Sequence, residues 1–324
     1  MICALLIPTL SGPLYAETIR VATWHAPLSR KGPGLLLRDI LRGEDTEIAA
    51  VTEGIDTLDP DILLLTNIDY DFDLIALNAL RNAMPDGANR YPYLWARKPN
   101  TGMPTGLDLD GDGRLGGPRD AQGFGYFAGQ GGMALMSRFP VGMDQVIDFS
   151  DLLWRDLPGN LMSPDDTGYD VQRLSSSAHW DVPLHLPGDR MLHLLAFYAT
   201  PPVFDGPEDR NGRRNHDEVA FWRRYLDGAI GGAPPTSEFV VIGDANLDSQ
   251  RGDGLHAAMI ALLADSRLTD PVPGSDSVHW PPPGPGTMRV SYVLPSADLG
   301  VAGAGHGPAV GPHRPVWVDL TIAP

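Results

Sequence analysis

The segment VVIGDANLD, residues 240–248, ends an apolar run with a carboxylate and an amide. Asp244 and Asn246 are two residues apart, and because side chains alternate along a strand, both lie on the same side of it. A carboxylate and an amide at such a strand end can orient a phosphate group, a water molecule or a hard cation. An Asx-turn that closes the strand uses the same two residue types. The segment therefore leaves a catalytic and a structural interpretation open.

A second segment, LDLDGDGR at residues 107–114, has the acid spacing of a calcium-binding loop. Asp108, Asp110 and Asp112 stand before a glycine, in the D-x-D-x-D-G pattern that wraps oxygen atoms around Ca²⁺. The last loop position, which is Glu in an EF-hand, is an arginine here, and Asp120 is the nearest acid to replace it. The segment predicts a calcium site, and the alternative is a solvated acidic turn.

Three arginines gather within residues 204–218 of an otherwise acidic protein, at Arg210, Arg213 and Arg214. Guanidinium groups bind phosphate or carboxylate in a bidentate geometry, so Arg210 and Arg213 are candidate anion ligands. Four acids of the same segment can pair with the arginines instead: Asp205, Glu208, Asp209 and Asp217. Because these acids are so near, we favour internal ion pairs over an anion site.

Strands and amphipathic helices alternate along the chain and must position these residues. The hydrophobic patterns predict strands at 19–24, 61–66, 133–137, 179–184, 191–198, 239–242, 289–293 and 316–321. They predict helices at 34–42, 47–58, 73–83 and 215–229. No Gly-x-Gly-x-x-Gly motif follows the first strand, which argues against a dinucleotide-binding fold. The pattern suits two packed sheets flanked by helices, within one domain over residues 17–324.

The composition is that of a globular protein with a strongly acidic surface. The chain has 324 residues, of which 43% are hydrophobic and 20% charged, so it can bury a large core. Its 37 glycines and 31 prolines predict many ordered loops between short elements. Acidic residues outnumber basic ones by 41 to 24, which gives a net charge of -17. That charge argues against a general nucleic-acid coating protein, whose affinity would come from Lys and Arg on phosphates.

The first part of the chain, residues 1–16, is apolar, ends in small residues and carries no charged side chain. We predict that it is a secretory signal peptide cleaved after Ala16, which would place the protein in the periplasm or outside the cell. The alternative is a buried first strand. The apolar run is too short to span a membrane. Since Cys3 is the only cysteine, cleavage would leave no thiol for a disulfide, a metal site or a nucleophile.

Six segments in order along the chain resemble the endonuclease/exonuclease/phosphatase family, the metal-dependent phosphoesterases related to deoxyribonuclease I and exonuclease III. They are IRVATWHAP, DILLLTNIDYD, GGMALMSRFPV, GDANLD, RVSYVLPS and HRPVWVDL. Residues 101–125 and 200–218 further resemble a secreted bacterial branch. The resemblance implies a four-layer α/β sandwich of two mixed sheets flanked by helices. It also implies phosphoester hydrolysis with Mg²⁺ or Mn²⁺, in which Asp244, Asn246 and His313 match catalytic positions.

Five other positions of the family pattern differ in this sequence. His25 stands where the resemblance implies an Asn that contacts metal or phosphate, and Asn67 stands where it implies the metal-binding Glu. Tyr198 replaces a His that binds the phosphate, and Ser291 replaces an Asp on the penultimate strand. Pro312 replaces the Asp that orients the general base.

These changes favour a member of the family without hydrolytic activity, a pseudoenzyme whose cleft binds a ligand or partner, such as a phosphorylated small molecule. Mg²⁺ prefers carboxylate oxygens, two of which are replaced, and a histidine base needs a partner that holds its tautomer. The alternative is an active phosphoesterase with a site rearranged around Asp244, Asn246, His313 and His25. A scaffold whose cleft has no function is a third interpretation.

Zinc is a further alternative, because His25, His179 and His313 could converge with Asp244 on a site rich in imidazole. A histidine beside a strand end is more often a hydrogen-bonded structural residue. In addition, no predicted element carries two candidate ligands at the spacing of a zinc site. From the sequence we therefore do not expect zinc.

Overall fold

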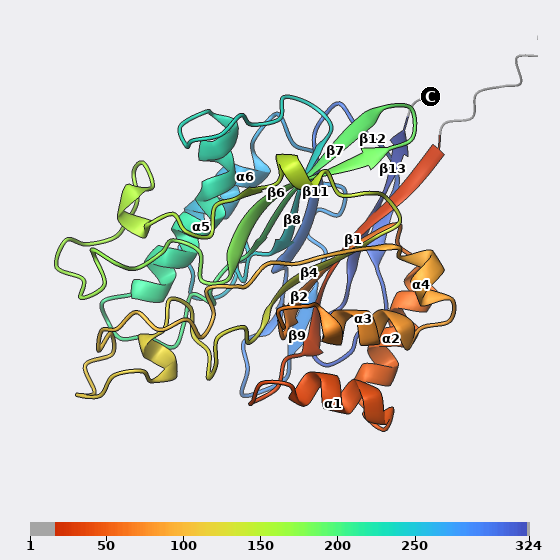
Figure 1. Ribbon diagram of the computed structural model, residues 1–324. Helices are drawn as coiled ribbons and strands as arrows, with labels where there is room; N and C mark the ends of the chain where they lie inside the picture. Colours follow the sequence, from red (N-terminus) through yellow and green to blue (C-terminus); the bar gives the residue numbers. More distant parts are fainter. Residues whose placement is uncertain (1–16, 323–324) are drawn as a thin grey trace, which may run out of the picture.

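The computed structural model of the protein describes residues 17–322. The predicted signal peptide, residues 1–16, lies outside the described residues. Two large β-sheets pack face to face, and helices cover the outer side of each sheet (Figure 1). These four layers confirm the α/β sandwich predicted from the sequence.

The first sheet has six strands in the order β12-β13-β1-β2-β4-β3. Its strands are β1 (Glu17–Leu28), β2 (Ile62–Ile68), β3 (Tyr93–Trp95), β4 (Gly132–Ser137), β12 (Gly300–His306) and β13 (Val316–Ile322). Strands β1 and β2 are parallel, whereas β13 and β4 pair with them in antiparallel fashion. Strands β1 and β2 therefore end at the same edge of the sheet, the lower edge in Figure 1.

The second sheet has five strands in the order β11-β8-β7-β6-β5. Its strands are β5 (Ile147–Asp148), β6 (Ala178–Leu186), β7 (Arg190–Tyr198), β8 (Phe239–Asp244) and β11 (Ser291–Pro295). Strands β7 and β8 are parallel, so they also end at one edge. A separate two-stranded ribbon consists of β9 (Val278–Trp280) and β10 (Gly286–Met288), and it flanks the proline-rich loop between them.

Helices pack on the outer face of each sheet. They are α1 (Leu35–Arg42), α2 (Thr46–Leu58), α3 (Ile75–Asn82) and α4 (Gly87–Arg90) on the six-stranded sheet, and α5 (Arg210–Leu226) and α6 (Ala257–Leu263) on the five-stranded sheet. Three short 3-10 helices lie in the loops, η1 (Pro118–Asp120), η2 (Met143–Gln145) and η3 (Trp154–Asp156). No helix within residues 17–322 is long and apolar enough to cross a membrane.

Strand β2 shows why this sequence forms a sheet with two buried faces. Ile62 and Leu64 point into the core between the two sheets, while Leu63 and Leu65 point into the core under the helices. All four side chains are at most 1% exposed. Because side chains alternate along a strand, a continuous apolar run is needed to fill both cores. The predicted strand at 61–66 is confirmed for that reason.

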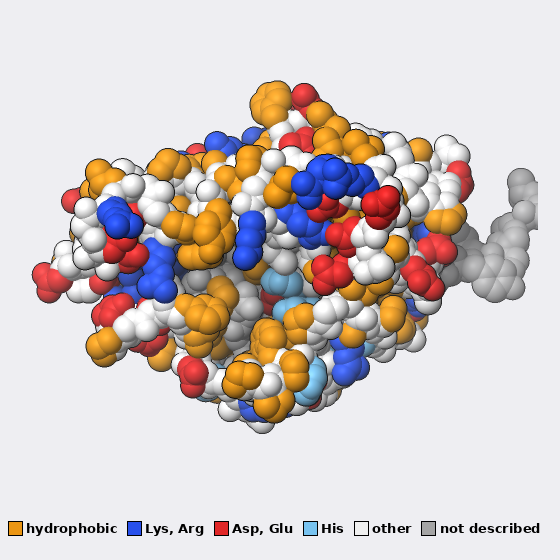
Figure 2. All heavy atoms as spheres, turned by 90° about the horizontal axis from the view of Figure 1, so that it is seen from below, with side chains coloured by type: hydrophobic (Ala, Val, Ile, Leu, Met, Phe, Trp, Pro, Cys, Tyr) orange, Lys and Arg blue, Asp and Glu red, His pale blue; other side chains and the backbone are white. Residues whose placement is uncertain are grey.

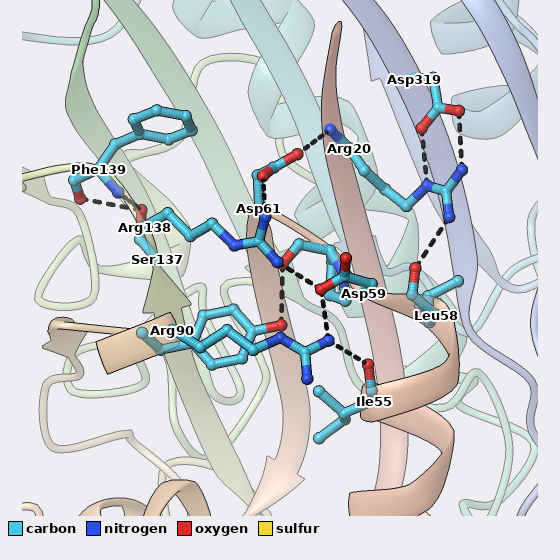
Figure 3. Close-up of polar contacts among 12 residues, drawn as sticks. Arg20, Ile55, Leu58, Asp59, Asp61, Arg90, Ser137, Arg138, Phe139 and Asp319 are labelled. Carbon is cyan, nitrogen blue, oxygen red and sulfur yellow. Dashed lines mark hydrogen bonds and ion pairs between the residues drawn. The ribbon is translucent and has the colours of Figure 1, made fainter. Parts of the chain in front are cut away.

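The upper edge of the six-stranded sheet carries a network of ion pairs (Figure 3). Arg20 donates from Nε to Asp319 Oδ1 at 2.7 Å, and its backbone N–H donates to Asp61 Oδ2 at 2.7 Å. Arg138 donates to Asp61 Oδ1 at 2.8 Å and also pairs with Asp59. A surface hollow of about 580 Å³ borders Asp59 and Arg138. Because these charges are paired with one another, we assign this end of the sheet a structural role, in which the ion pairs join neighbouring strands.

Two predicted elements are shifted in the structure. The helix expected at 215–229 is α5, which begins at Arg210 and ends at Leu226. Its N-cap residue, Asp209, has φ 50° and makes no side-chain capping bond, so the usual sequence signal for a helix start is missing. The strand expected at 289–293 begins at Ser291. Strand β12 was not expected, because its sequence GVAGAGH lacks the bulky alternation by which strands are recognised.

Candidate functional site

Three side chains far apart in the sequence meet where the two sheets end. His25 Nδ1 lies 2.5 Å from Asp244 Oδ2. The imidazole rings of His25 and His313 stack at 4.0 Å between centroids, with 16° between their planes. One nitrogen of each ring and one carboxylate oxygen of Asp244 all lie within 4.8 Å of one another. We call this group the His-Asp-His cluster.

The five-stranded sheet places three of the site positions side by side. Asp244 is the last residue of β8 and is fully buried. Its neighbour in the parallel strand β7 is Tyr198, and its neighbour in the antiparallel strand β11 is Ser291. Neighbours in register across a sheet point to the same face. The three positions selected from the sequence therefore belong to one site.

The six-stranded sheet supplies the opposite side of the site. His25 lies near the end of β1, and its neighbour in β2 is Thr66. Asn67 follows at φ 59°, and its amide Nδ2 donates to the backbone oxygen of Ala26 at 3.2 Å. The amide at this position is thus committed to holding β1 and β2 together.

Asn246 has a structural role next to the cluster. Its backbone N–H donates to Asp244 Oδ1 at 3.2 Å, which is the geometry of an Asx-turn. Its side chain donates from Nδ2 to the backbone oxygen of Ala199 at 2.9 Å. The structural interpretation of the GDAN segment is confirmed by this turn, and the contact of Asp244 Oδ2 with His25 leaves the catalytic interpretation a prediction.

His313 sits in the loop that precedes β13, and this loop is pinned to β9. The backbone oxygen of Pro312 accepts from the N–H of His279 at 2.9 Å. The Trp280 ring is nearly perpendicular to His313 at 5.5 Å between centroids, and the Tyr198 ring is nearly perpendicular to His25 at 5.4 Å. Each of the stacked imidazoles therefore also contacts an aromatic ring.

The electrostatics of His313 differ from those of an ordinary histidine. Burial lowers its pKa to about 3, and the neighbouring His25 lowers the pKa further while Asp244 opposes the shift. The imidazole of His313 is therefore neutral at pH 7 and a weak base. Pro312 offers no side-chain oxygen to orient the ring.

Three buried polar atoms around the cluster lack hydrogen-bond partners within residues 17–322: His313 Nδ1, Ser291 Oγ and Thr66 Oγ1. His313 is 5% exposed, Ser291 1% and Thr66 0%. Leaving a buried polar atom unpaired costs about 1–3 kcal/mol. Three such atoms at one end of the sheets mark a place where water or a bound polar group can complete the hydrogen bonds.

Figure 2 shows a hollow on the lower face of the molecule, with histidine side chains at its base and hydrophobic side chains around it. The side chain of His25 is 16% exposed, whereas that of Asp244 is 0% exposed. A ligand that enters from solvent would therefore meet the imidazole before it meets the carboxylate.

His179 does not belong to the site, so the alternative in which three histidines converge on Asp244 does not hold for this residue, and the structural interpretation of it is correct. Its ring is fully buried and lies against Phe197, Phe221 and Trp222. Ser175 Oγ lies 2.8 Å from Nδ1, and the backbone oxygen of Glu218 lies 2.9 Å from Nε2. Burial lowers the pKa of His179 to about 4. The sequence could not reveal this, because β6 turns the residue toward α5.

The arginine segment forms the start of α5 and is bonded internally. Arg213 pairs with Asp166 at 2.9 Å, and Arg210 donates to Gln172 Oε1 at 2.8 Å. Arg214 is buried and donates to the backbone oxygen of Leu174 at 2.8 Å. Internal pairing is thus present, although the acid partner of Arg213 comes from another loop rather than from the same segment.

The acidic loop brings Asp108, Asp110 and Asp120 together, with one oxygen of each within 4.8 Å of the others. Asp120 is the replacement expected from the sequence, and it accepts from the backbone N–H of Leu109 at 2.8 Å. That hydrogen bond is the main reason why the pKa of Asp120 lies below its usual value. Asp112 is outside this group, and its Oδ1 accepts from the N–H of Arg114 at 2.8 Å. Calcium binding stays a prediction.

Comparisons with known proteins support the family and the fold of this chain. The sequence profile of the Endonuclease/Exonuclease/phosphatase family matches residues 34–318. A protein of that description from Beutenbergia cavernae has a TM-score of 0.60 at 17% identity, over 94% of this chain and 72% of that chain. No curated protein matches the sequence at a significant level.

Two solved structures with names of specific enzymes share the fold. Sphingomyelinase C from Streptomyces griseocarneus gives a TM-score of 0.52 at 17% identity, over 94% of this chain and 99% of that chain. The mannosyl-6-phosphatase Bt3783 from Bacteroides thetaiotaomicron gives 0.52 at 13% identity, over 94% and 100%. A related fold also occurs in the beta toxin of Staphylococcus aureus, which was solved with bound magnesium ions, at a TM-score of 0.52 and 12% identity over 94% and 100%.

Proposed function

Because the chain belongs to the endonuclease/exonuclease/phosphatase family, we propose that it is a member whose metal-dependent phosphoester hydrolysis is lost or strongly reduced. Its remaining role is to bind a ligand in the cleft above the His-Asp-His cluster. The observation that carries the proposal is the ligand set of that cluster, which contains two imidazoles and a single carboxylate among the described side chains.

This ligand set does not fit Mg²⁺ or Mn²⁺ as the family would use them. Mg²⁺ requires near-octahedral oxygen coordination and is usually bound through one or two carboxylates. Here Asp244 Oδ2 contacts His25, and the amide of Asn67 donates to a backbone oxygen. Ser291 offers a neutral hydroxyl in place of a third oxygen anion. Of these three positions only Asp244 offers a carboxylate, and its Oδ2 is already engaged with His25.

The proton-transfer part of the site is altered as well. A histidine base is efficient when its pKa lies near the working pH and a carboxylate holds its tautomer. His313 has a pKa of about 3 and is preceded by Pro312. Loss of one general base commonly costs a factor of about 10²–10⁴ in rate. The metal and base defects together explain why hydrolysis would be lost.

The ligand we propose is a phosphorylated small molecule rather than a nucleic acid. The net charge of -17 opposes binding of a polyanion. Two structural relatives are named for phosphorylated lipids or sugars, a sphingomyelinase and a mannosyl-6-phosphatase. Calorimetric titration with mannose 6-phosphate, with mannose as the control, tests this part of the proposal. Equal binding of the two sugars would show that the protein does not recognise the phosphate group.

Hydrolysis assays with a restored variant test the loss of activity. The purified chain and the fourfold variant H25N/N67E/S291D/P312D are incubated with bis-p-nitrophenyl phosphate and with plasmid DNA. Mg²⁺, Mn²⁺, Ca²⁺ and Zn²⁺ are supplied in turn. We expect no turnover by the natural chain and measurable Mg²⁺-dependent turnover by the variant. Turnover by the natural chain that disappears in both His313→Ala and Asp244→Ala would overturn the proposal.

A second candidate, an active phosphoesterase with a rearranged site, is favoured by one observation. The 2.5 Å contact between His25 Nδ1 and Asp244 Oδ2 is the arrangement in which a carboxylate orients an imidazole base. The side chain of His25 is partly exposed, so its other nitrogen can reach a substrate. This candidate requires hydrolysis that is abolished by His25→Ala.

Two further parts of the proposal concern calcium and export. The acidic loop binds Ca²⁺ through Asp108, Asp110 and Asp120, which is supported by the mutual approach of their oxygens. The apolar residues 1–16 direct export to the periplasm or the medium. A higher melting temperature in CaCl₂ than in EGTA, lost in Asp108→Asn, tests the first part. N-terminal sequencing of protein from cell fractions tests the second.

A further inference from the structure

We infer that the loops at one side of the cleft form a docking surface for a membrane whose lipids carry zwitterionic phosphate headgroups. This surface, which we call the aromatic-basic rim, lies at the edge of the six-stranded sheet where β1 and β2 end. It consists of three exposed aromatic and three exposed basic side chains, Phe72, Phe124, Tyr126, Lys31, Arg97 and Lys98. The inference goes beyond the proposed function, because it concerns where the protein is held and not what the cleft binds.

The three aromatic rings are exposed although the backbone that carries them is well packed. Phe72 is 87% exposed, and Phe124 and Tyr126 are each 59% exposed. Between the last two residues Gly125 is buried, and a Cβ added to it would lie 2.7 Å from the backbone nitrogen of Gly102. The rings of Phe124 and Tyr126 meet edge to face at 5.7 Å between centroids. Large rings that a fixed backbone holds outward together mark a binding surface.

Hydrogen bonds join the loops that carry these rings. The N–H of Tyr70, two residues before Phe72, donates to the backbone oxygen of Gly129 at 2.8 Å. In the same loop as Gly129, the N–H of Tyr126 donates to Gln130 Oε1 at 2.7 Å. The loop after β2 and the loop before β4 therefore form one continuous surface.

The basic residues lie on segments that contact this surface. Gln130 donates from Nε2 to the backbone oxygen of Arg30, directly before Lys31, at 2.8 Å. Pro99, which follows the other two basic residues, packs on the first residue of β4, since a Cβ added to Gly132 would lie 2.9 Å from Pro99 Cγ. The aromatic and basic members of the rim thus come from adjoining loops at one edge of the sheet.

The basic side chains of the rim are free to bind a ligand. Lys31 and Lys98 are the only two lysines of the sequence, and both are exposed, as is Arg97. Within residues 17–322 none of the three forms an ion pair, whereas most of the arginines are paired with acids. Unpaired cations in a chain with a net charge of -17 indicate that the rim meets a negatively charged group, such as a phosphate.

The rim also offers partners for a positively charged group. Asp71 is engaged, because it accepts from the N–H groups of Ile75 and Ala76 at the start of α3. Asp73 is exposed beside Phe72. Aromatic faces attract quaternary ammonium groups. A zwitterionic headgroup therefore finds partners for its phosphate and for its ammonium on the same surface.

The composition of the rim favours a lipid surface over other partners. Aromatic and long basic side chains together are the residue types that settle at the headgroup level of a membrane. The net charge of -17 opposes a nucleic acid, a second copy of this chain and a strongly anionic membrane. A zwitterionic lipid surface carries no net charge and is not repelled.

The rim borders the cleft. A Cβ added to Gly131, next to the loop that carries Tyr126, would lie 3.2 Å from the side-chain oxygen of Asn67. Hydrophobic side chains surround the hollow on this face of the molecule (Figure 2). A membrane bound to the rim would therefore lie against the opening of the cleft.

Vesicle binding by the full chain tests the inference. The chain is sedimented with vesicles of phosphatidylcholine, and the bound fraction gives the partition coefficient. We expect saturable binding to these vesicles and weaker binding to vesicles of phosphatidylglycerol, because an anionic surface repels the net charge of -17. The double variant Phe72→Ala/Tyr126→Ala should lower the partition coefficient at least about 10-fold, since two large apolar side chains no longer enter the bilayer. The triple variant K31Q/R97Q/K98Q should lower it at least about 3-fold.

Matched controls separate the rim from other apolar parts of the chain. The double variant Met143→Ala/Ile260→Ala removes side chains that are 57% and 54% exposed on η2 and α6, and it should bind as the natural chain does. Every variant keeps the apolar residues 1–16, so these cannot account for a difference between variants. In vesicles of brominated phosphatidylcholine, the added fluorescence of Phe72→Trp should be quenched and that of Ile260→Trp should not. Circular dichroism verifies that each variant is folded.

Three results would overturn the inference. They are absence of binding to phosphatidylcholine vesicles, binding that Phe72→Ala/Tyr126→Ala leaves unchanged, and binding confined to phosphatidylglycerol. A dimer in sedimentation velocity that the same double variant dissociates would assign the rim to a second copy of the chain instead. Vesicle binding is measured without turnover and without a sugar ligand, so its failure is distinct from a failure of the proposed function.

Discussion

His25 of the six-stranded sheet and Asp244 of the five-stranded sheet approach each other to 2.5 Å across the open end of the sandwich. This contact joins the two sheets at the end that borders the cleft. Asp244 is fully buried, so its carboxylate depends on His25 and on the N–H of Asn246 for partners. The pair is therefore a structural link between the sheets as well as the core of the proposed site.

A double-mutant cycle measures this link. His25→Ala leaves a buried carboxylate with one partner fewer, and loss of a hydrogen bond to a buried polar group lowers the free energy of unfolding by about 1–3 kcal/mol. Asp244→Asn should cost a similar amount. We expect the double variant to be more stable than the sum of the two losses predicts, as judged by urea denaturation with EDTA present. Strict additivity would show that the two side chains do not interact in solution.

Ser291 offers a test of the unpaired polar atoms. Its Oγ lacks a partner among the described residues, so Ser291→Ala removes a cost and should leave the EDTA-treated protein as stable or up to about 1 kcal/mol more stable. The matched control is Ser277→Ala, because Ser277 Oγ accepts from the N–H groups of Val290 and Ser291 at 2.9 and 3.0 Å. That control should lose about 1–3 kcal/mol. Equal losses in both variants would show that Ser291 has a partner after all.

The pH dependence of stability should reflect His179. Its pKa is lowered to about 4 in the folded protein because the ring is buried, whereas an unfolded histidine titrates near 6.5. Between these values only the unfolded state gains the proton, so stability falls as the pH drops from about 6.5 to about 4. The full loss amounts to about 3 kcal/mol. His179→Gln should reduce this slope in urea denaturation between pH 7 and pH 4, and an unchanged slope would assign the effect to other groups.

The sequence predicted the elements of this fold where local patterns match the final burial. Strand β2 is apolar because both faces are buried, and the GDAN segment identified Asp244 because a strand end fixes the direction of its side chain. The edge strand β12, at Gly300–His306, was not predicted because its glycines and alanines show no alternation of large apolar and polar side chains. The start of α5 escaped because Asp209 does not cap it with its side chain.

The composition of the site was harder to predict than its location. Sequence comparison identified His25 and His313 as site positions, but their stacking at 4.0 Å depends on how the loop before β13 packs against β9. His179 was grouped with them by residue type, and only the register of β6 shows that it faces α5 instead. Trp280 and Thr66 were missed because neither belongs to a recognisable motif. Their place in the site follows only from their neighbours in the fold, His313 and His25.

Gly243 controls the position of Asp244 through the backbone. It has φ 147°, which side-chain-bearing residues rarely adopt, and a Cβ added there would lie 1.8 Å from the backbone oxygen of Phe197. Gly243→Ala must therefore shift β8 away from β7 immediately before the carboxylate. We expect a loss of at least about 2 kcal/mol in unfolding free energy, measured by urea denaturation. Gly231→Ala is the control, because no described atom lies within 4 Å of its added Cβ. A Gly243→Ala variant as stable as Gly231→Ala would show that the close packing of β7 and β8 does not require glycine at this position.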